Sequence, residues 1–205
     1  MFATIYLPNF YLQAALRHQT LLPITPVALI DETEKKPVII QLNPAAEVAG
    51  VHKGMTPSQG LARCLTLLIK TRSSSQEKTI QEIVFHHAFS LSPYVEATSP
   101  GVYTVQFTND GEFMRKDAWH RHPADETWAG SPCYKLSRVI DQLAACEVTA
   151  QAGLSQTPDT SFLAAHLARP VLEIKDPKEF LAPLSIDTLA IPFGFTEKRS
   201  PGRDD

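Results

Sequence analysis

Runs of apolar and polar residues divide the chain into short strands and helices. An apolar run at residues 2–7, closed by Pro8, predicts a buried first strand. Asn9 is placed to cap the helix that follows. Two runs rich in β-branched residues, 27–30 and 38–42, flank a polar turn and predict a hairpin. The N-terminal part is therefore expected to hold a strand, a helix and then a hairpin.

Capping residues mark where several later helices should begin. Thr56-Pro57-Ser58-Gln59 combines a cap residue, a proline at the first helical position and a side chain that reaches back. Ser74 with Glu77 has the spacing of a second capping box. Thr157 and Asp176, each followed by proline, predict two further helix starts.

The order of elements indicates the fold class. The remaining segments are expected to be strands at 65–70, 94–97, 102–107, 148–154 and 171–174, a helix around 136–143, and a long loop at 109–132. The resulting β-α-β-β-α-β core is the ferredoxin-like arrangement, so the sequence predicts an α+β fold.

The same order predicts a division of the chain into parts. A main domain is expected from residues 1–20 and 72–191, with a small α/β insert at 21–71. The polar segment 192–205, which carries proline and glycine, is expected to be a disordered tail.

Composition narrows the class of protein further. The chain has 205 residues, 43% of them hydrophobic, which suits one domain with a small insert. A net charge of −3 argues against gripping nucleic acid by bulk charge. The three cysteines are far apart and predict neither a zinc site nor a disulfide framework. With no secretion signal and no long apolar run, we expect a cytoplasmic protein that makes no membrane contact.

One segment carries a family resemblance. Residues 37–62 resemble the fingers of Y-family (UmuC/DinB-like) translesion DNA polymerases, and the Gly-Val-x-x-Gly-Met core stands intact at 50–55. Phe10 and Tyr11 match the aromatic pair after the family's first strand, where Tyr11 would be the ribose-sensing residue. The resemblance covers roughly residues 2–191 and implies a ferredoxin-like polymerase palm with a small α/β fingers insert. We expect Tyr11 to be packed in the palm.

The family's metal-binding carboxylates are replaced in this chain. Y-family polymerases hold two divalent ions about 4 Å apart with carboxylates, because magnesium prefers hard oxygen ligands. The two aspartate positions of the first strand hold Tyr6 and Pro8. The Asp-Glu pair of the family's palm hairpin falls on Gly101 and Val102. The resemblance therefore implies no metal cofactor and no polymerase activity.

The family's triphosphate contacts are replaced as well. Its fingers tyrosine and arginine fall on Pro44 and Glu47, and its palm lysine falls on Phe162. A carboxylate in place of the arginine would repel a triphosphate, because the arginine normally supplies charge-assisted hydrogen bonds. We therefore expect no nucleotide cofactor.

The ImuB-like branch of the Y family shares these losses. It is similar to this chain in its start at 2–10, in Pro-Val-Ala-Leu at 26–29 and in Ser-Pro-Tyr-Val at 92–95. The resemblance implies a catalytically inactive adaptor in DNA damage tolerance, translesion synthesis and the SOS response. Its expected partners are a mutagenic replicative-type polymerase and a RecA-like accessory protein, with weak DNA binding. The family continues into a thumb and a little finger, and this chain stops about where the thumb would begin.

Two alternatives stay open at this stage. The scaffold could carry unrelated chemistry if Glu96, Asp110 and His87 converged in the cleft. The chain could also be a truncated remnant without function. Lys70 and Arg72 are expected to be solvated cations, as two charges beside a serine run usually are.

Overall fold

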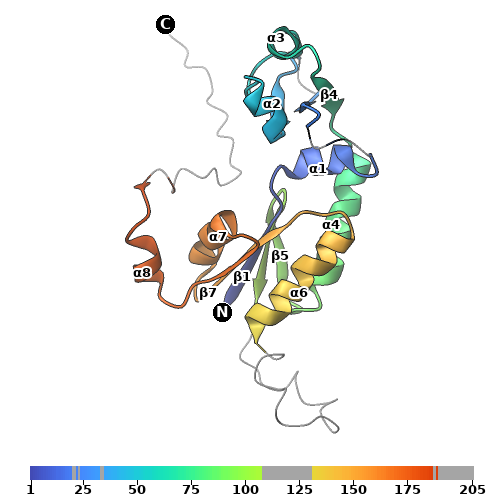
Figure 1. Ribbon diagram of the computed structural model, residues 1–205. Coiled ribbons are helices and arrows are strands. Elements are labelled where there is room, and N and C mark those ends of the chain that lie inside the picture. Colours follow the sequence, from blue (N-terminus) through green and yellow to red (C-terminus); the bar gives the residue numbers. More distant parts are fainter. Residues whose placement is uncertain (20–21, 23, 33–34, 108–130, 187, 189–205) are drawn as a thin grey trace, which may run out of the picture.

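The computed structural model describes residues 1–19, 22, 24–32, 35–107, 131–186 and 188. Its strands form a five-stranded sheet in the order β5-β6-β1-β7-β8 and a three-stranded sheet in the order β3-β2-β4 (Figure 1). The strands are β1 (Phe2–Tyr6), β2 (Val27–Ile30), β3 (Ile39–Leu42), β4 (Leu68–Thr71), β5 (Val95–Ser99), β6 (Val102–Gln106), β7 (Gln151–Ser155) and β8 (Val171–Glu173). The helices are α1 (Phe10–Leu16), α2 (Pro44–Val48), α3 (Pro57–Arg63), α4 (Ser74–Ala88), α6 (Pro132–Ala145), α7 (Pro158–Leu167) and α8 (Pro177–Leu181).

The larger sheet has the predicted ferredoxin-like core. β1 lies between β6 and β7 and is antiparallel to both. The elements β1, α4, β5, β6, α6 and β7 follow one another in the β-α-β-β-α-β order, and β8 extends the sheet in parallel with β7. In Figure 1, α4 and α6 lie on one side of this sheet and α7 lies on the other. The α+β fold class expected from the sequence is confirmed.

Alternation along the strands builds the main core on the α4 and α6 side. Neighbouring residues of a strand face opposite sides of the sheet, so Ala3 and Ile5 of β1 face the helices while Thr4 faces α7. α6 presents one apolar stripe, as its sequence pattern predicts. The core residues from the sheet and α6 are Ala3, Ile5, Tyr103, Val105, Ala152, Leu154, Leu136, Val139, Ile140 and Leu143.

Tyr103 is the one aromatic side chain among the most deeply buried of the described core, and its hydroxyl group has no hydrogen-bond partner. Burial raises its pKa from 10.0 to about 12. Replacing Tyr103 with phenylalanine removes an unsatisfied buried group, so we expect the protein to gain about 1 kcal/mol of stability.

The same substitution should change the stability at alkaline pH. Because the folded pKa of Tyr103 is raised, its ionisation leaves the stability of the protein unchanged below pH 10.0 and lowers it as the pH rises from 10.0 toward 12. Urea unfolding at roughly pH 8 and pH 11 should show a smaller alkaline loss for Tyr103→Phe than for the parent protein. A variant that is less stable at the lower pH would contradict the absence of a partner for this hydroxyl group.

Three of the predicted helix starts are confirmed. Thr56 and Gln59 form a reciprocal capping box, in which Thr56 Oγ1 accepts from the Gln59 amide and Gln59 Oε1 accepts from the Thr56 amide. Thr157 Oγ1 accepts from the Thr160 amide at the start of α7. Asp176 likewise caps α8 through its carboxylate. These starts were found because the cap and its partner lie within three residues of each other.

Two other predicted helix caps do not make the expected side-chain hydrogen bonds. The N-cap of α4 is Ser73, which makes no side-chain cap hydrogen bond, so Ser74 and Glu77 form no capping box. Asn9 precedes α1 in the left-handed conformation, with a φ of 50°, and also makes no side-chain cap hydrogen bond. Its side-chain nitrogen instead donates to the Leu42 carbonyl at 3.4 Å.

β2, β3 and β4 form the smaller sheet, and the retained Gly-Val-x-x-Gly-Met motif lies between α2 and α3. β2 pairs with β3 antiparallel and with β4 parallel. Gly50 and Gly54 both have a positive φ, of 81° and 85°, which only glycine adopts at little cost. The Gly54 amide donates to the Ile39 carbonyl at 2.8 Å, and Val51 is fully buried. The motif is therefore explained by folding alone.

Candidate functional site

The end of β1 meets the β5–β6 hairpin, where the resemblance places the family's carboxylates. Tyr6 is paired with Val102 across the β1–β6 ladder. One residue further along, the Leu7 amide donates to the Gly101 carbonyl at 2.8 Å. Positions that lie almost a hundred residues apart in the sequence are thus neighbours in the fold, as the family's arrangement requires.

The side chains at these positions form an apolar cluster. Val102 and Phe162 are both buried, although Phe162 comes from α7 on a separate part of the chain. Leu163 completes the buried part, and Tyr6 and Phe180 pack against it. The structure therefore packs together Tyr6, Val102 and Phe162, the residues on which the resemblance places the first aspartate, one member of the Asp-Glu pair and the lysine, in one hydrophobic cluster.

His166 joins this cluster and was not predicted from the sequence. Its ring stacks on Tyr6 with a centroid distance of 3.8 Å and lies 4.3 Å from the ring centroid of Phe162. Burial lowers the pKa of His166 and raises the pKa of Tyr6, so both groups are neutral near pH 7. The sequence signal available was the helical spacing, because His166 is four residues after Phe162 on the same face of α7.

At Gly101 the backbone itself excludes a side chain. Its φ is +77°, a region that aspartate and other L residues adopt only at a cost. A Cβ added here would lie 2.6 Å from Phe10 Cβ and 3.2 Å from the Leu7 carbonyl oxygen. An aspartate cannot be placed at this position without moving α1.

The donor set at these positions does not fit a pair of magnesium ions. The tyrosine, proline, glycine and valine at Tyr6, Pro8, Gly101 and Val102 supply no carboxylate, whereas magnesium requires hard, charged oxygen ligands. Within the ranges that the structure describes, no group of three His, Cys, Asp or Glu side chains could hold a metal ion.

Pro44 and Glu47, the positions of the fingers tyrosine and arginine, lie on α2 and are exposed. α2 was not predicted, although Asn43 caps it through a side-chain bond to the Ala46 amide and Pro44 follows as its first residue. This cap-and-proline pair was the signal for the helix. The apolar cluster around Val102 does not include Pro44 or Glu47.

Arg72 was expected to be solvated, and this prediction is wrong. Its Nε and Nη2 donate to the Glu77 carboxylate at 3.0 and 2.8 Å, and its Nη1 donates to Asp31 Oδ2 at 2.8 Å. The guanidinium carbon lies 4.0 Å from the centroid of the Tyr11 ring, within cation–π range. The hydrogen bonds to Glu77, ahead of those to Asp31, raise the pKa of Arg72.

This ion-pair cluster lies where the chain passes between the two sheets. Asp31 directly follows β2, Arg72 directly follows β4, and Glu77 and Tyr11 belong to α4 and α1. Tyr11 is packed, as the resemblance led us to expect, with the Arg72 guanidinium on its ring. Arg72 therefore joins the smaller sheet to two helices of the larger unit.

Two of the residues suggested for unrelated chemistry, Glu96 and His87, are not brought together. Glu96 on β5 is paired with Thr104 and faces away from α4, because the adjacent Val95 packs on the main core. His87 is on α4, with its Nε2 3.8 Å from Cys146 Sγ. Asp110 lies outside the described residues. Glu96 and His87 thus belong to opposite faces of the sheet.

Comparisons with solved structures show that this fold is similar to that of Y-family DNA polymerases. The structure of DinB from Sulfolobus solfataricus matches with a TM-score of 0.72 at 13% identity, covering 91% of this chain and 52% of that one. A ternary complex of Dbh DNA polymerase matches with a TM-score of 0.71 at 14% identity, covering 91% of this chain and 53% of that one. The chain thus spans about half the length of these polymerases.

The sequence pattern of the impB/mucB/samB family matches residues 5–166, which is most of the chain. The chain therefore belongs to the impB/mucB/samB family. No curated protein matches the whole sequence significantly. Among the helices of the described ranges, none is both long and apolar enough to cross a membrane.

Proposed function

We propose that this chain is a catalytically inactive, ImuB-like member of the Y family that acts as an adaptor in DNA damage tolerance. The observation that carries the proposal is the apolar cluster of Tyr6, Val102 and Phe162 at the positions of the family's carboxylates and lysine. Phosphoryl transfer depends on metal ions and fixed charges that stabilise the transition state. A neutral aromatic and aliphatic cluster supplies neither.

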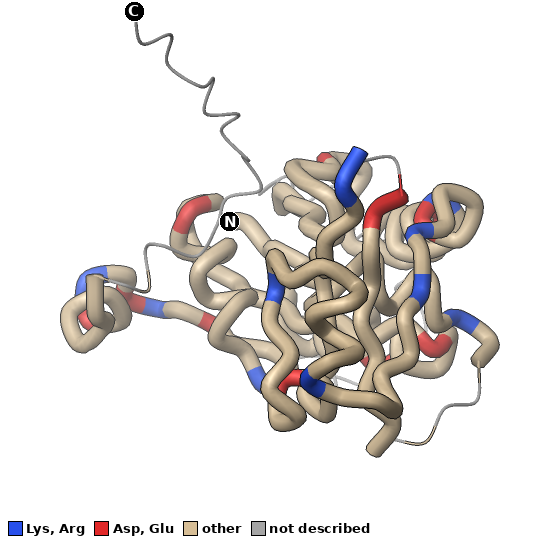
Figure 2. The backbone as a smooth tube through the Cα atoms, turned by 90° about the horizontal axis from the view of Figure 1, so that it is seen from above, with Lys and Arg blue, Asp and Glu red and all other residues tan. Residues whose placement is uncertain are grey.

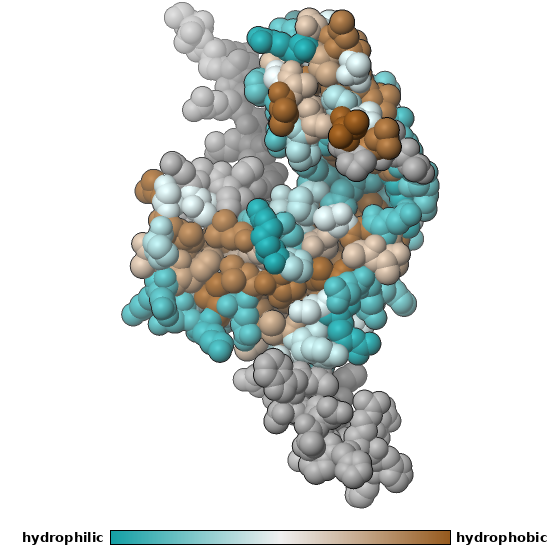
Figure 3. Space-filling model, viewed as in Figure 1, coloured by the Kyte–Doolittle hydropathy of each residue, from teal (hydrophilic) through white to brown (hydrophobic). Residues whose placement is uncertain are grey.

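An adaptor needs stable surfaces on which partner proteins can dock. The unit around the smaller sheet exposes apolar side chains that suit such docking. Val48 and Leu65 are each 90% exposed, and Ile24 is 79% exposed. Figure 3 shows several hydrophobic side chains on the surface of this unit, in the upper part of the view. Exposed apolar groups of this kind favour protein contacts. A mutagenic replicative-type polymerase and a RecA-like accessory protein are the proposed partners.

Weak DNA binding is part of the proposal. Acidic and basic residues are interspersed along the tube in Figure 2, and the whole sequence carries a net charge of −3. Because affinity for the phosphate backbone depends on clustered cations, such a distribution favours weak, non-specific contacts.

Primer extension tests the loss of catalysis. With a labelled primer–template, all four deoxynucleotides and Mg²⁺ or Mn²⁺, we expect no extension above that of a blank purified in parallel. A Y-family polymerase assayed in the same buffers serves as the positive control. Extension that follows the parent chain through successive purification steps and is lost when the chain is depleted with an antibody would overturn the proposal, because a contaminating polymerase would remain.

A DNA titration tests the second part of the proposal. Fluorescence anisotropy with the same primer–template at roughly 50 and 200 mM salt should show weak binding that falls as salt rises. Addition of a deoxynucleotide and Mg²⁺ is expected to leave the affinity unchanged, because the triphosphate contacts are replaced. Tighter binding in their presence would mean that a nucleotide site exists elsewhere in the chain.

A further inference from the structure

A cysteine and a histidine meet at the seam between α4 and α6. Cys146, which directly follows α6, has its Sγ 3.8 Å from Nε2 of His87 in the last turn of α4. Both helices cover the face of the larger sheet opposite α7, so this pair lies across the sheet from the Tyr6 cluster (Figure 1). A nucleophilic side chain and a base are thus in contact at a place that the proposed function does not use.

The three cysteines of the chain lie in different surroundings. Cys64 is buried, with its Sγ 3.4 Å from Thr66 Oγ1. Cys133 is half-buried, and burial, the negative charge of Glu173 and a hydrogen bond to that carboxylate raise its pKa. Cys146 is half-buried as well, but its neighbour is an imidazole instead of a carboxylate. Because the thiolate is the nucleophile, Cys146 is the thiol best placed to react.

His87 can accept the proton that Cys146 must lose. A neutral imidazole with an unprotonated Nε2 takes the proton from Sγ and becomes a cation, which leaves a thiolate beside it. His87 is in the last turn of α4, the end of a helix at which a positive charge is favoured. The end of α6 disfavours the thiolate for the same reason. The thiolate of Cys146 therefore depends on the imidazolium group of His87.

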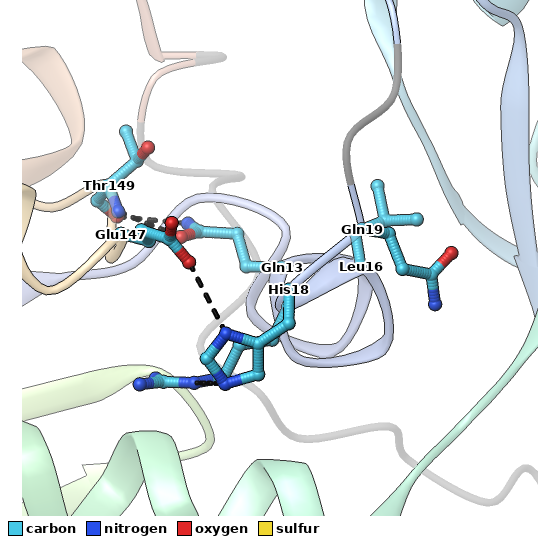
Figure 4. A pocket seen from close by; sticks show the side chains of 7 residues that line it. Gln13, Leu16, His18, Gln19, Glu147 and Thr149 are labelled. Atoms are coloured by element: carbon cyan, nitrogen blue, oxygen red, sulfur yellow. Dashed lines mark hydrogen bonds and ion pairs between the residues drawn. The ribbon is translucent and has the colours of Figure 1, made fainter.

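The carboxylate nearest to Cys146 in the sequence belongs to Glu147 and has a different partner. Its Oε2 lies 3.6 Å from Nδ1 of His18, just after α1, in the surface pocket that Figure 4 shows. The negative charge of Glu147 repels an anionic reagent more than a neutral one. A neutral reagent is therefore the better probe of the Cys146 thiol.

We propose that Cys146 is a site of reversible modification by thiol–disulfide exchange, with His87 as the base. The sulfur of Cys146 attacks one sulfur of a small disulfide, and a new S–S bond forms as the old one breaks. The other half of the reagent leaves as a thiolate and takes the proton held by His87. The products are one mixed disulfide and one free thiol, so the small disulfide is itself the oxidant. The site goes beyond the proposed adaptor role and does not rest on it.

Reaction of the reduced full chain with hydroxyethyl disulfide, a small neutral disulfide, tests this site. Samples are acidified at intervals, the free thiols are blocked, and mass spectrometry of the peptides gives the extent of reaction at each cysteine. Near pH 7 we expect Cys146 to react about tenfold faster than Cys133, with Cys64 the slowest, because thiolate fraction and access differ. Added dithiothreitol should restore the free thiol.

A pair of histidine variants sharpens the test. His87→Gln should lower the rate at Cys146 about tenfold and leave the other two cysteines unchanged, because only this thiol loses its base. His86→Gln is the matched control. His86 is the exposed neighbour on α4, with its ring centroid 5.3 Å from that of His87, and its loss should leave the rate at Cys146 unchanged. A variant that merely loosened the packing would raise the rates at all three cysteines, so a drop at one site is the signature of the missing base.

Two results would overturn the inference. They are a rate at Cys146 no higher than that at Cys133, and equal rates at Cys146 in the parent chain and in His87→Gln. Should His87→Gln fail to fold, the order in which the cysteines of the parent chain react decides. Neither result bears on primer extension, so the site can fail while the inactive polymerase-like assignment holds. The reverse also applies, since an active polymerase could carry the same reactive thiol.

Discussion

Replacement of Arg72 by methionine is expected to lower the free energy of unfolding by about 2–4 kcal/mol. The side chains of Asp31 and Glu77 are only 15% and 11% exposed, and both bond to the same guanidinium group. Without it, Glu77 would lose two charge-assisted hydrogen bonds and Asp31 would lose one. Methionine keeps an unbranched apolar side chain, so the change removes the guanidinium group together with its ion pairs and its cation–π contact with Tyr11. Urea unfolding at pH 7, followed by circular dichroism, measures the effect.

Arg63 provides the matched control. It is an exposed arginine in the last turn of α3, so Arg63→Met should change the stability by no more than about 0.5 kcal/mol. Adding Glu77→Gln to Arg72→Met should restore part of the loss, because one unpaired carboxylate is removed. A loss of less than about 1 kcal/mol for Arg72→Met would mean that the cluster behaves like an ordinary surface ion pair.

The Arg72 cluster also shows where sequence reasoning reached its limit. Asp31 and Arg72 are separated by 41 positions, and nothing local marks them as partners. The Ser74–Glu77 spacing suggested a capping box, but the bidentate bond from Arg72 occupies the carboxylate of Glu77 instead. The helix begins one residue earlier than the spacing suggested, with Ser73 as its N-cap, and Glu77 is left to bond with Arg72. Caps such as Thr56–Gln59 were predictable because both partners lie in one helical turn.

The order of strands and helices was predictable for a related reason. Apolar residues repeat every two positions in a strand and every 3.6 in a helix when the element buries only one face. The elements of the main core each bury one face in this way. α7 is the exception, because it is buried on several sides, including Thr160, Phe162 and Ala164. Only its cap at Thr157 marked it as a helix. The four-residue spacing of Phe162 and His166 therefore indicated a shared helix face, but not the stacking of His166 on Tyr6.

The family resemblance gave residue-by-residue expectations for a site, but not how those residues pack together. The replaced positions at Tyr6, Val102 and Phe162 were identified one by one from short motifs. Their packing against one another and against Phe180 of α8 depends on the backbone path of four separate segments. The Gly101 backbone adds a constraint that no motif contains, since its positive φ and the nearby Phe10 exclude a Cβ.

The position of α7, and with it the aromatic cluster, depends on Gly153. A Cβ at this residue of β7 would overlap the Ser161 carbonyl oxygen and the Ala165 backbone nitrogen, neither of which can rotate away. The hydrogen bond of 2.8 Å between Thr4 Oγ1 and Ser161 Oγ exists at the same close approach. Gly153→Ala is therefore expected to cost more than about 3 kcal/mol, because the whole helix must shift from the sheet.

Gly54→Ala serves as the control for this substitution. Gly54 has a φ of +85° and open space around its Cβ, so alanine there should cost only the strain of a left-handed backbone, about 1–2 kcal/mol. The two variants also differ in a second readout, the ring-current shift that Tyr6 imposes on the His166 protons at a centroid distance of 3.8 Å. Gly153→Ala should weaken this shift and Gly54→Ala should preserve it. Equal stability and equal shifts in both variants would mean that α7 does not depend on the missing side chain. In that case the aromatic cluster would owe its geometry to side-chain packing alone.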